Sequence, residues 1–262
     1  MKAVLSSKST ILFIILGGFF IANTLIAEFI GIKIFSLEET LGFESLSWTM
    51  FGVKDLGFNL TAGVLLWPVV FVMTDIINEY YGKRGVKLLS YLAAGLILYA
   101  FIMFFLAIGL SPNEWWKSSS GVVEADPNAS LSNMDLAFRK IFGQGNWIIM
   151  GSLVAFLVGQ FLDVSVFQWI KRKTGENKIW LRATGSTLIS QFVDSFVVLI
   201  IAFYIGADWE LGRVLAIGMM NYFYKFFMAV ILTPLIYLGH YLIEIYLGEE
   251  AEILKRHALG KD

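Results

Sequence analysis

Long apolar runs, separated by short polar stretches, fill most of the chain. Six of them have the length of membrane-spanning helices, since a hydrocarbon core of about 30 Å needs roughly 20 apolar residues. They lie near residues 11–34, 58–80, 86–111, 145–170, 183–206 and 213–247. Membrane strands are not expected, because the runs lack the alternation of barrel strands and an open sheet cannot sit in lipid. The pattern predicts an all-α membrane protein, a six-transmembrane-helix bundle that forms one polytopic domain over residues 1–262.

The basic residues are unevenly shared between the two sides of this bundle. The amino end, the second and fourth loops and the tail hold 13 of the 20 Lys and Arg residues, and the other loops hold six. The fourth loop alone has five: Lys171, Arg172, Lys173, Lys178 and Arg182. Because cytoplasmic loops are enriched in Lys and Arg, both termini are expected in the cytoplasm. That placement requires an even number of spans, which independently supports six.

Two long loops are expected on the outer side. Residues 35–57 contain acidic and aromatic side chains, which suit either a surface hairpin or a lid. Residues 112–144 begin polar and end in an amphipathic piece at 131–142, which could lie in the membrane interface. For both loops, a solvated connection with interfacial aromatic residues is the simpler interpretation.

Composition narrows the class of protein further. Of 262 residues, 57% are hydrophobic and 16% are charged, and the mean hydropathy is +0.71, as in a polytopic membrane protein. The chain has no cysteine, which excludes disulfides, cysteine metal sites and thiol catalysis. The net charge of −1 gives no indication of a nucleic-acid surface. The first apolar run is too long for a cleaved signal peptide.

Ionisable side chains nevertheless occur within or at the ends of the predicted spans. Each costs roughly 2.5–3.5 kcal/mol at a helix centre, so they are expected to face the interior of the bundle. Asp75, Asn78 and Glu79 stand at i, i+3 and i+4, which places them on one stripe, although Glu79 lies close enough to the interface to be wet. The six residues are Glu28, Asp75, Glu79, Asp163, Asp194 and Lys225.

The fourth and fifth spans share a pattern of amide and acid three residues apart. It reads QFLD at residues 160–163 and QFVD at residues 191–194. In antiparallel helices these groups would sit at similar depth, where they could face one cavity. The sixth span adds Asn221 and Lys225 at i and i+4, and the first adds Asn23 beside the stripe of Thr24, Glu28 and Gly31.

Charge within the spans is unbalanced on this reading. Five acids and one lysine give a formal −4, which burial and like-charge repulsion oppose. Either some acids are protonated, or water enters, or a ligand rich in hydrogen-bond donors satisfies them, and Lys225 is expected to pair with one acid. The structural alternative is interhelical hydrogen bonding, worth about 0.6–2 kcal/mol for each residue.

These residues resemble the queuosine precursor transporter family. The strongest match is PVVFVMTDIINEYYGKR at residues 68–84, whose TD-x-x-NE-x-YGK core is specific. Further similar segments follow in the expected order: AFRKIFG at 137–143, QFLDVSVFQWIKRKT at 160–174, WLRATGSTLISQFVDS at 180–195 and YKFFMAVILTPLIY at 224–237. The insertion at residues 112–135 departs from the family pattern.

The resemblance implies a six-helix fold, related to the substrate-binding components of energy-coupling-factor transporters, that imports a 7-deazaguanine-type base such as preQ0, preQ1 or queuine for salvage in tRNA modification. Such a base presents a ring N–H beside an exocyclic amine, a donor pair that a carboxylate accepts. The expected partners are thus a small planar base and the bilayer of the bacterial inner membrane, with no nucleic acid, metal or cofactor. The predicted substrate-binding residues are Asp75, Asn78, Glu79, Gln160, Asp163, Gln191, Asp194, Tyr222, Lys225 and Asn23.

Two other functions stay open. The chain could be a binding subunit that needs a separate ATPase and coupling partner, since it has no G-x-x-x-x-G-K-[ST] motif of its own. An intramembrane enzyme is the remote alternative, because His240 and His257 are the only histidines and neither belongs to an H-E-x-x-H or G-x-S-x-G motif. The sequence does not decide between a homo-oligomer and a complex with a coupling subunit, and we expect no enzymatic activity.

Overall fold

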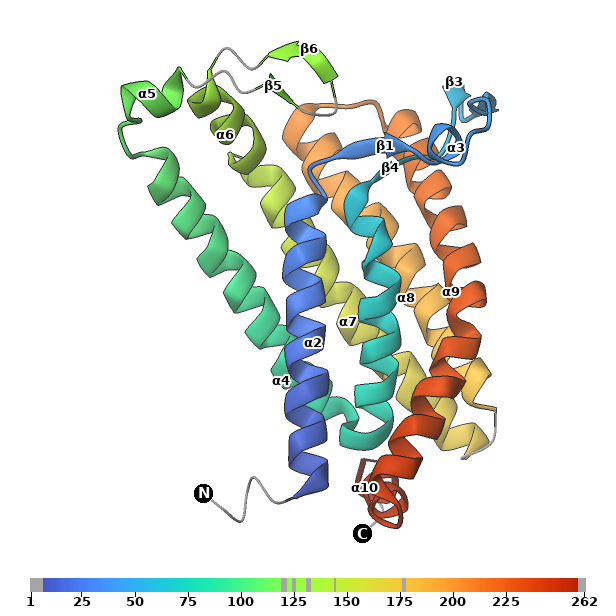
Figure 1. Ribbon diagram of the computed structural model, residues 1–262. Helices are drawn as coiled ribbons and strands as arrows, with labels where there is room; N and C mark the ends of the chain where they lie inside the picture. Colours follow the sequence, from blue (N-terminus) through green and yellow to red (C-terminus); the bar gives the residue numbers. More distant parts are fainter. Residues whose placement is uncertain are drawn as a thin grey trace.

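The computed structural model describes residues 7–118, 122–123, 126–130, 133–143, 145–175 and 178–258. Within this part of the chain, five helical stretches are long and apolar enough to cross a membrane. They are α2 (Lys8–Ile30), α4 (Trp67–Ile108), the stretch Met134–Thr174, the stretch Ile179–Ile205 and α9 (Leu211–Leu247). The fold is therefore a multi-helix membrane bundle (Figure 1).

The 42-residue helix α4 is divided by a bend at Gly82. Gly82 has φ 65° and ψ −173°, a conformation open to glycine and strained for other residues. Figure 1 shows the chain reversing direction at this bend, so the two arms of α4 run in opposite directions. The predicted separation of a second run ending at 80 from a third beginning at 86 corresponds to this reversal.

The other long helices follow the predicted runs with shifted ends. Residues 58–66, which we expected to open the second span, instead contain strand β4 (Asn59–Thr61) and the short helix η1 (Ala62–Leu65). The stretch Met134–Thr174 contains α6 (Met134–Phe142) and α7 (Asn146–Thr174), and Ile179–Ile205 contains α8 (Ile179–Leu199) and the π-helical η2 (Ile200–Ile205). The predicted amphipathic piece is thus a helix, α6, over its described part.

Small two-stranded sheets cover the end of the bundle opposite the termini (Figure 1). Strand β1 (Ile34–Ser36) pairs with β4 in antiparallel register, with α3 (Leu37–Thr40) next to it in sequence. Strands β2 (Trp48–Met50) and β3 (Val53–Leu56) form the hairpin expected within residues 35–57. In the second long loop, α5 (Glu114–Lys117) precedes β5 (Val122–Val123) and β6 (Asp126–Ser130). Residues 119–121, 124–125 and 131–132 of the predicted insertion lie outside the described residues.

The bundle is apolar outside and partly polar inside. Large hydrophobic side chains such as Ile15, Leu88 and Ile231 are exposed, as is expected of helix faces that contact lipid. An apolar core joins α2, α4, α7, α8 and α9 to the C-terminal helix α10 (Glu250–Ala258). Buried among these helices are carboxylates, amides and hydroxyls, and this interior set contains the candidate site.

Candidate functional site

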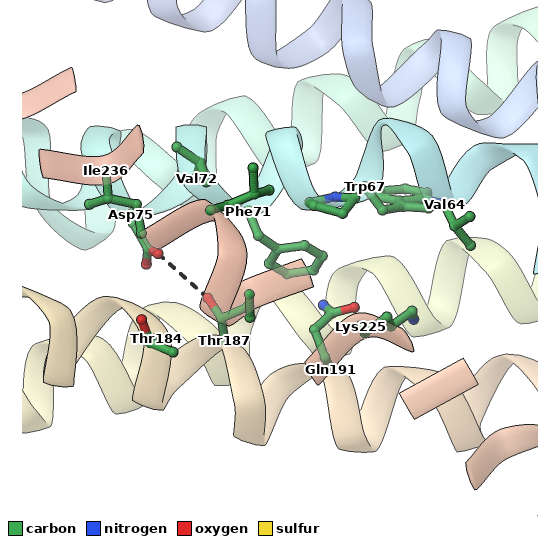
Figure 2. A pocket seen from close by; sticks show the side chains of 13 residues that line it. Val64, Trp67, Phe71, Val72, Asp75, Thr184, Thr187, Gln191, Lys225 and Ile236 are labelled. Carbon is green, nitrogen blue, oxygen red and sulfur yellow. Dashed lines mark hydrogen bonds between the residues drawn. The ribbon is translucent and has the colours of Figure 1, made fainter. Parts of the chain in front are cut away.

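A cavity lies between the first arm of α4 and helices α8 and α9. Each helix contributes residues at helical spacing, so each presents one stripe to the cavity. Figure 2 shows these stripes facing one another across it. The lining residues are Val64, Trp67, Pro68, Phe71, Val72 and Asp75 from η1 and α4, Thr184, Thr187 and Gln191 from α8, and Lys225, Ala229, Leu232 and Ile236 from α9.

The cavity is narrow in this arrangement of the helices. The space between its lining atoms is about 450 Å³, but this includes the open mouth. The part in which the centre of a water molecule can sit is only about 20 Å³. A bicyclic ligand therefore requires the stripes of α4, α8 and α9 to move apart.

Two of the polar groups that line the cavity have unused hydrogen-bonding capacity. Asp75 is 1% exposed, and its Oδ1 atom has no hydrogen-bond partner among the described residues. The Nε2 donor of Gln191 is likewise buried without a partner there. Burying such groups unpaired is costly, typically about 1–3 kcal/mol each, so the site is complementary to a molecule that offers both donors and an acceptor.

Asp75 shares a hydroxyl with a second acid behind the cavity wall. The Thr187 hydroxyl lies 3.5 Å from Asp75 Oδ2 and 3.4 Å from Asp163 Oδ1. Ser190 also donates to Asp163 Oδ1, at 3.2 Å. Beside them, Gln160 accepts from the Thr74 hydroxyl at 3.0 Å, while Asp163 Oδ2 and Gln160 Nε2 have no partner among the described residues.

Lys225 pairs with an acid, as predicted from the charge count. Its Nζ atom lies 2.5 Å from Asp194 Oδ2, and both side chains are partly exposed. Asp194 packs over Gly159 of α7, where an added Cβ would lie 3.5 Å from Asp194 Cβ. The two amide–acid pairs of α7 and α8 therefore differ in their surroundings: Asp163 meets hydroxyls, whereas Asp194 meets a cation.

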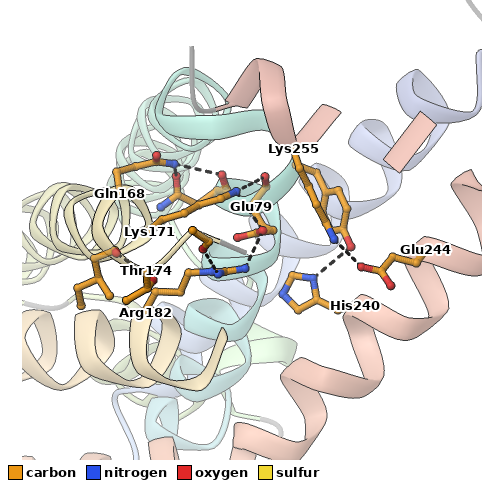
Figure 3. Close-up of polar contacts among 12 residues, drawn as sticks. Glu79, Gln168, Lys171, Thr174, Arg182, His240, Glu244 and Lys255 are labelled. Atoms are coloured by element: carbon orange, nitrogen blue, oxygen red, sulfur yellow. Dashed lines mark hydrogen bonds and ion pairs between the residues drawn. The ribbon is translucent and has the colours of Figure 1, made fainter. Parts of the chain in front are cut away.

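Glu79 lies in a separate, fully buried ion cluster (Figure 3). Glu79 comes three residues before the bend at Gly82, which Figure 1 shows at the end of the bundle that carries the termini. Its Oε1 atom lies 2.8 Å from Arg182 Nη2 and 3.0 Å from Lys171 Nζ, and all three side chains are 0% exposed. Gln168 donates to Asn78 Oδ1 at 2.7 Å. We define Asn78, Glu79, Gln168, Lys171 and Arg182 as the Glu79 network.

This network corrects three expectations. Glu79 is buried and not exposed to solvent at the interface. Lys171 and Arg182, which we expected in a cytoplasmic loop, are buried and form ion pairs with Glu79. The interior charge is therefore less negative than −4, because two further cations offset the acids. The last of the five interior acids, Glu28 of α2, accepts a hydrogen bond from Ser152.

The C-terminal helix closes this same end of the bundle. Tyr80, next to Glu79, is hydrogen-bonded through its hydroxyl to His240 Nδ1 of α9 at 3.1 Å. Lys255 of α10 binds Glu244 of α9 at 2.5 Å (Figure 3). A Cβ at Gly82 would lie 2.9 Å from the Ala258 carbonyl oxygen, so α10 packs directly against the bend.

Of the ten predicted binding residues, Asp75, Gln191 and Lys225 line the cavity. The other seven do not: Asn78, Glu79, Gln160, Asp163 and Asp194, whose contacts are given above, and Asn23 and Tyr222. Asn23 donates its side-chain amide to Phe19 O of its own helix at 2.8 Å. Tyr222 packs edge-on against Phe192, with ring centroids 5.1 Å apart. The binding roles of these residues, and of the other predicted residues, stay predictions.

Two aromatic residues of the cavity were missed in the sequence. Trp67 and Phe71 lie eight and four residues before Asp75, so they continue its stripe at helical spacing. Figure 2 shows both on the wall opposite Gln191 and Lys225. Extending the polar stripe backwards would have found them, and their rings offer flat apolar surfaces beside the polar groups.

The arrangement suits recognition of a flat, polar ring system. The Asp75 carboxylate can accept from two adjacent N–H groups, Gln191 can donate to a carbonyl, and the Trp67 and Phe71 rings can pack against a planar face. Among the described residues no group of three or more His, Cys, Asp or Glu side chains could hold a metal ion.

Comparisons with known proteins agree with the geometry. Residues 61–239 match the family described as "Putative vitamin uptake transporter". A "Probable queuosine precursor transporter" of Bacillus subtilis is 30% identical over 75% of this chain and 80% of its own length, and one of Haemophilus influenzae is 28% identical over 68% and 67%. The "Queuosine precursor transporter" of Escherichia coli is 23% identical over 68% and 72%. No solved structure matches significantly. The chain belongs to this family of vitamin uptake transporters.

Proposed function

We propose that this protein imports a queuosine precursor, a base of the 7-deazaguanine type, and binds it in the cavity beside Asp75. The observation that carries the proposal is the pair of buried atoms Asp75 Oδ1 and Gln191 Nε2, which come from different helices, line one cavity and have no hydrogen-bond partner among the described residues. The ring N–H and exocyclic amine of the base match the carboxylate, and its carbonyl matches the amide. The names of the three relatives support the same ligand.

The proposal includes a membrane arrangement. The reversal at Gly82 makes two spans of α4, which gives six spans in total, with both termini in the cytoplasm and the β2–β3 hairpin outside the inner membrane. Because the chain has no cysteine, single introduced cysteines report this arrangement cleanly. Ser47→Cys should react with an impermeant maleimide on intact cells, and Glu249→Cys only after the membrane is opened. The reverse pattern would contradict the orientation.

Uptake by purified protein in liposomes tests the function. Wild-type protein should accumulate labelled 7-cyano-7-deazaguanine, and Asp75→Asn should lose at least about 100-fold of that uptake, because two charge-assisted hydrogen bonds are worth about 3 kcal/mol or more. Asp135→Asn, in a partly exposed ion pair of α6 that does not line the cavity, is the matched control and should transport normally. Equal uptake by Asp75→Asn would overturn the assignment. Binding without transport would identify a binding subunit that needs an ATPase partner.

A further inference from the structure

The acids of the interior differ in how their charge is compensated. Glu79 has two cations and Asp194 has one. Asp75 and Asp163, 1% and 0% exposed, form no ion pair among the described residues. They belong to different helices, α4 and α7, and meet through the Thr187 hydroxyl of α8. This pair of carboxylates therefore lies at the junction of three helices without a cation of its own.

The carboxylates of Asp75 and Asp163 have fewer hydrogen-bond donors around them than oxygen atoms that can accept. The Thr187 hydroxyl has one hydrogen and can donate to only one of the two acids at a time. Its distances of 3.5 and 3.4 Å are longer than the usual O–H···O range of about 2.5–3.0 Å. Ser190 donates to Asp163 Oδ1, but Asp75 Oδ1 and Asp163 Oδ2 have no partner among the described residues. The four carboxylate oxygens of Asp75 and Asp163 therefore have room for at least one more hydrogen-bonding proton.

Arg182 has a favourable electrostatic effect on Asp75, but the cations near the pair are each bound to another acid. On α4, Glu79 is a further negative charge, and Arg182 of α8 and Lys171 of α7 are bound to that Glu79. Lys225 of α9 is bound to Asp194 of α8, and His240 of α9 faces Tyr80. A sodium ion is a poor alternative, because α4, α7 and α8 are continuous helices here and their carbonyl oxygens are used within them. A proton needs only the acids themselves.

We propose that Asp75 and Asp163 hold one proton between them in this closed arrangement, and that it resides on Asp163 when a base occupies Asp75. The second part, the location of the proton when a base is bound, rests on the proposed function. With Asp163 neutral, Thr187 can donate to Asp75 and the Asp75 carboxylate can accept the donors of the base. When the proton leaves, two buried negative charges face each other and oppose both closure and binding. Base binding is thus linked to protonation of Asp163.

Infrared spectroscopy tests the proton without any ligand. Purified wild-type protein should show the carbonyl stretch of a protonated carboxylic acid, which disappears as the pH is raised. The band should be lost in Asp163→Asn and retained in Glu28→Gln, the control that removes another buried acid. A band that is absent from folded wild-type protein, or unchanged in Asp163→Asn, would overturn the proposal. The spectrum of folded wild-type protein can by itself contradict the proposal, so the test does not depend on whether a variant folds.

Calorimetric titration with 7-deazaguanine tests the linkage. Between about pH 5.5 and about pH 8.5, the wild-type Kd should rise about tenfold per pH unit once the proton is lost, and titrations in two buffers should show proton uptake on binding. Asp163→Asn, which is neutral at every pH, should bind with a constant Kd and no proton uptake. A wild-type Kd independent of pH would contradict the linkage and leave the proposed function standing. A wild type that binds no base would contradict the proposed function and leave the infrared result to decide on the proton.

Discussion

Asp75 and Glu79 are acids one helical turn apart on the same helix, and both are buried, yet their surroundings are opposite. Glu79 is bound by Lys171 and Arg182, so its charge is compensated within the protein. Asp75 has only a long hydrogen bond from Thr187 and one oxygen without a partner among the described residues. Each acid keeps one oxygen without a hydrogen-bond partner among the described residues, so the two differ in charge compensation. On our proposal, the compensated acid holds helices together and the uncompensated acid receives the ligand.

The largest effect on stability should come from removing the charge of Glu79, the acid that is paired with cations. Glu79→Gln leaves Lys171 and Arg182 buried without their anion, which should cost about 3–5 kcal/mol of stability. Asp75→Asn removes an uncompensated charge and should change stability by less than about 1 kcal/mol. Unfolding of both variants in detergent measures the difference. Equal losses would mean that the two acids have the same structural role.

A smaller loss is expected at the bend that follows Glu79. Gly82→Ala places a side chain at φ 65° and ψ −173°, a region almost restricted to glycine, which costs about 1–3 kcal/mol. It also brings the new Cβ to 2.9 Å from the Ala258 carbonyl oxygen. Thermal unfolding should show this loss. Gly95→Ala, on an open face of the same helix, is the control and should be neutral or slightly stabilising. A Gly82→Ala protein as stable as the wild type would show that the bend tolerates a side chain.

Substitutions in the cavity beside Asp75 should change the affinity for the base more than the stability of the fold. Phe71→Leu removes an aromatic face from the cavity and should weaken binding of 7-deazaguanine about fivefold, since an aromatic contact is worth about 1 kcal/mol. Phe101→Leu makes the same change in a core cluster of α4 and α7 that is away from the cavity. That control should lower stability without changing Kd. A Kd unchanged by Phe71→Leu would exclude stacking on this ring.

The smallest effect concerns an acid outside the bundle. Burial raises the pKa of Glu38, but hydrogen bonds from the Phe58 N–H and the Ser36 hydroxyl outweigh it and leave the pKa below its ordinary value. A lowered pKa stabilises the folded loop above the unfolded pKa, and that stabilisation is lost as the pH falls through the folded value. Limited proteolysis of the β1–β4 region should therefore speed up in acid, and Glu38→Gln should abolish this dependence. Cleavage equally fast at all pH values would contradict it.

The sequence predicted the helical elements better than their ends. Apolar runs located the long helices, and the predicted break between residues 80 and 86 corresponds to the reversal within α4. The start of α4 was placed too early, because residues 58–66 are as apolar as a span but pair with β1 or form η1. Hydropathy measures solubility in lipid, and it does not distinguish a covered strand from the first turns of a helix.

The site was predicted as a set of polar residues but not as an arrangement. Helical spacing correctly placed Asp75, Asn78 and Glu79 in the interior, and charge balance correctly gave Lys225 an acidic partner. The burial of Lys171 and Arg182 was missed, since basic residues after an apolar run also indicate a loop. Which acid receives which cation depends on how helices far apart in sequence pack together, and no local pattern records that.

Calorimetric titration of purified wild-type and Asp75→Asn protein with 7-deazaguanine tests the central claim most directly. The claim is that incomplete hydrogen bonding around Asp75 is completed by a planar base. The wild type should bind one base per chain, and Asp75→Asn should bind at least about 100-fold more weakly while it unfolds at a similar temperature. Equal affinity of the two proteins would contradict the account, as would a folded wild type that binds no base.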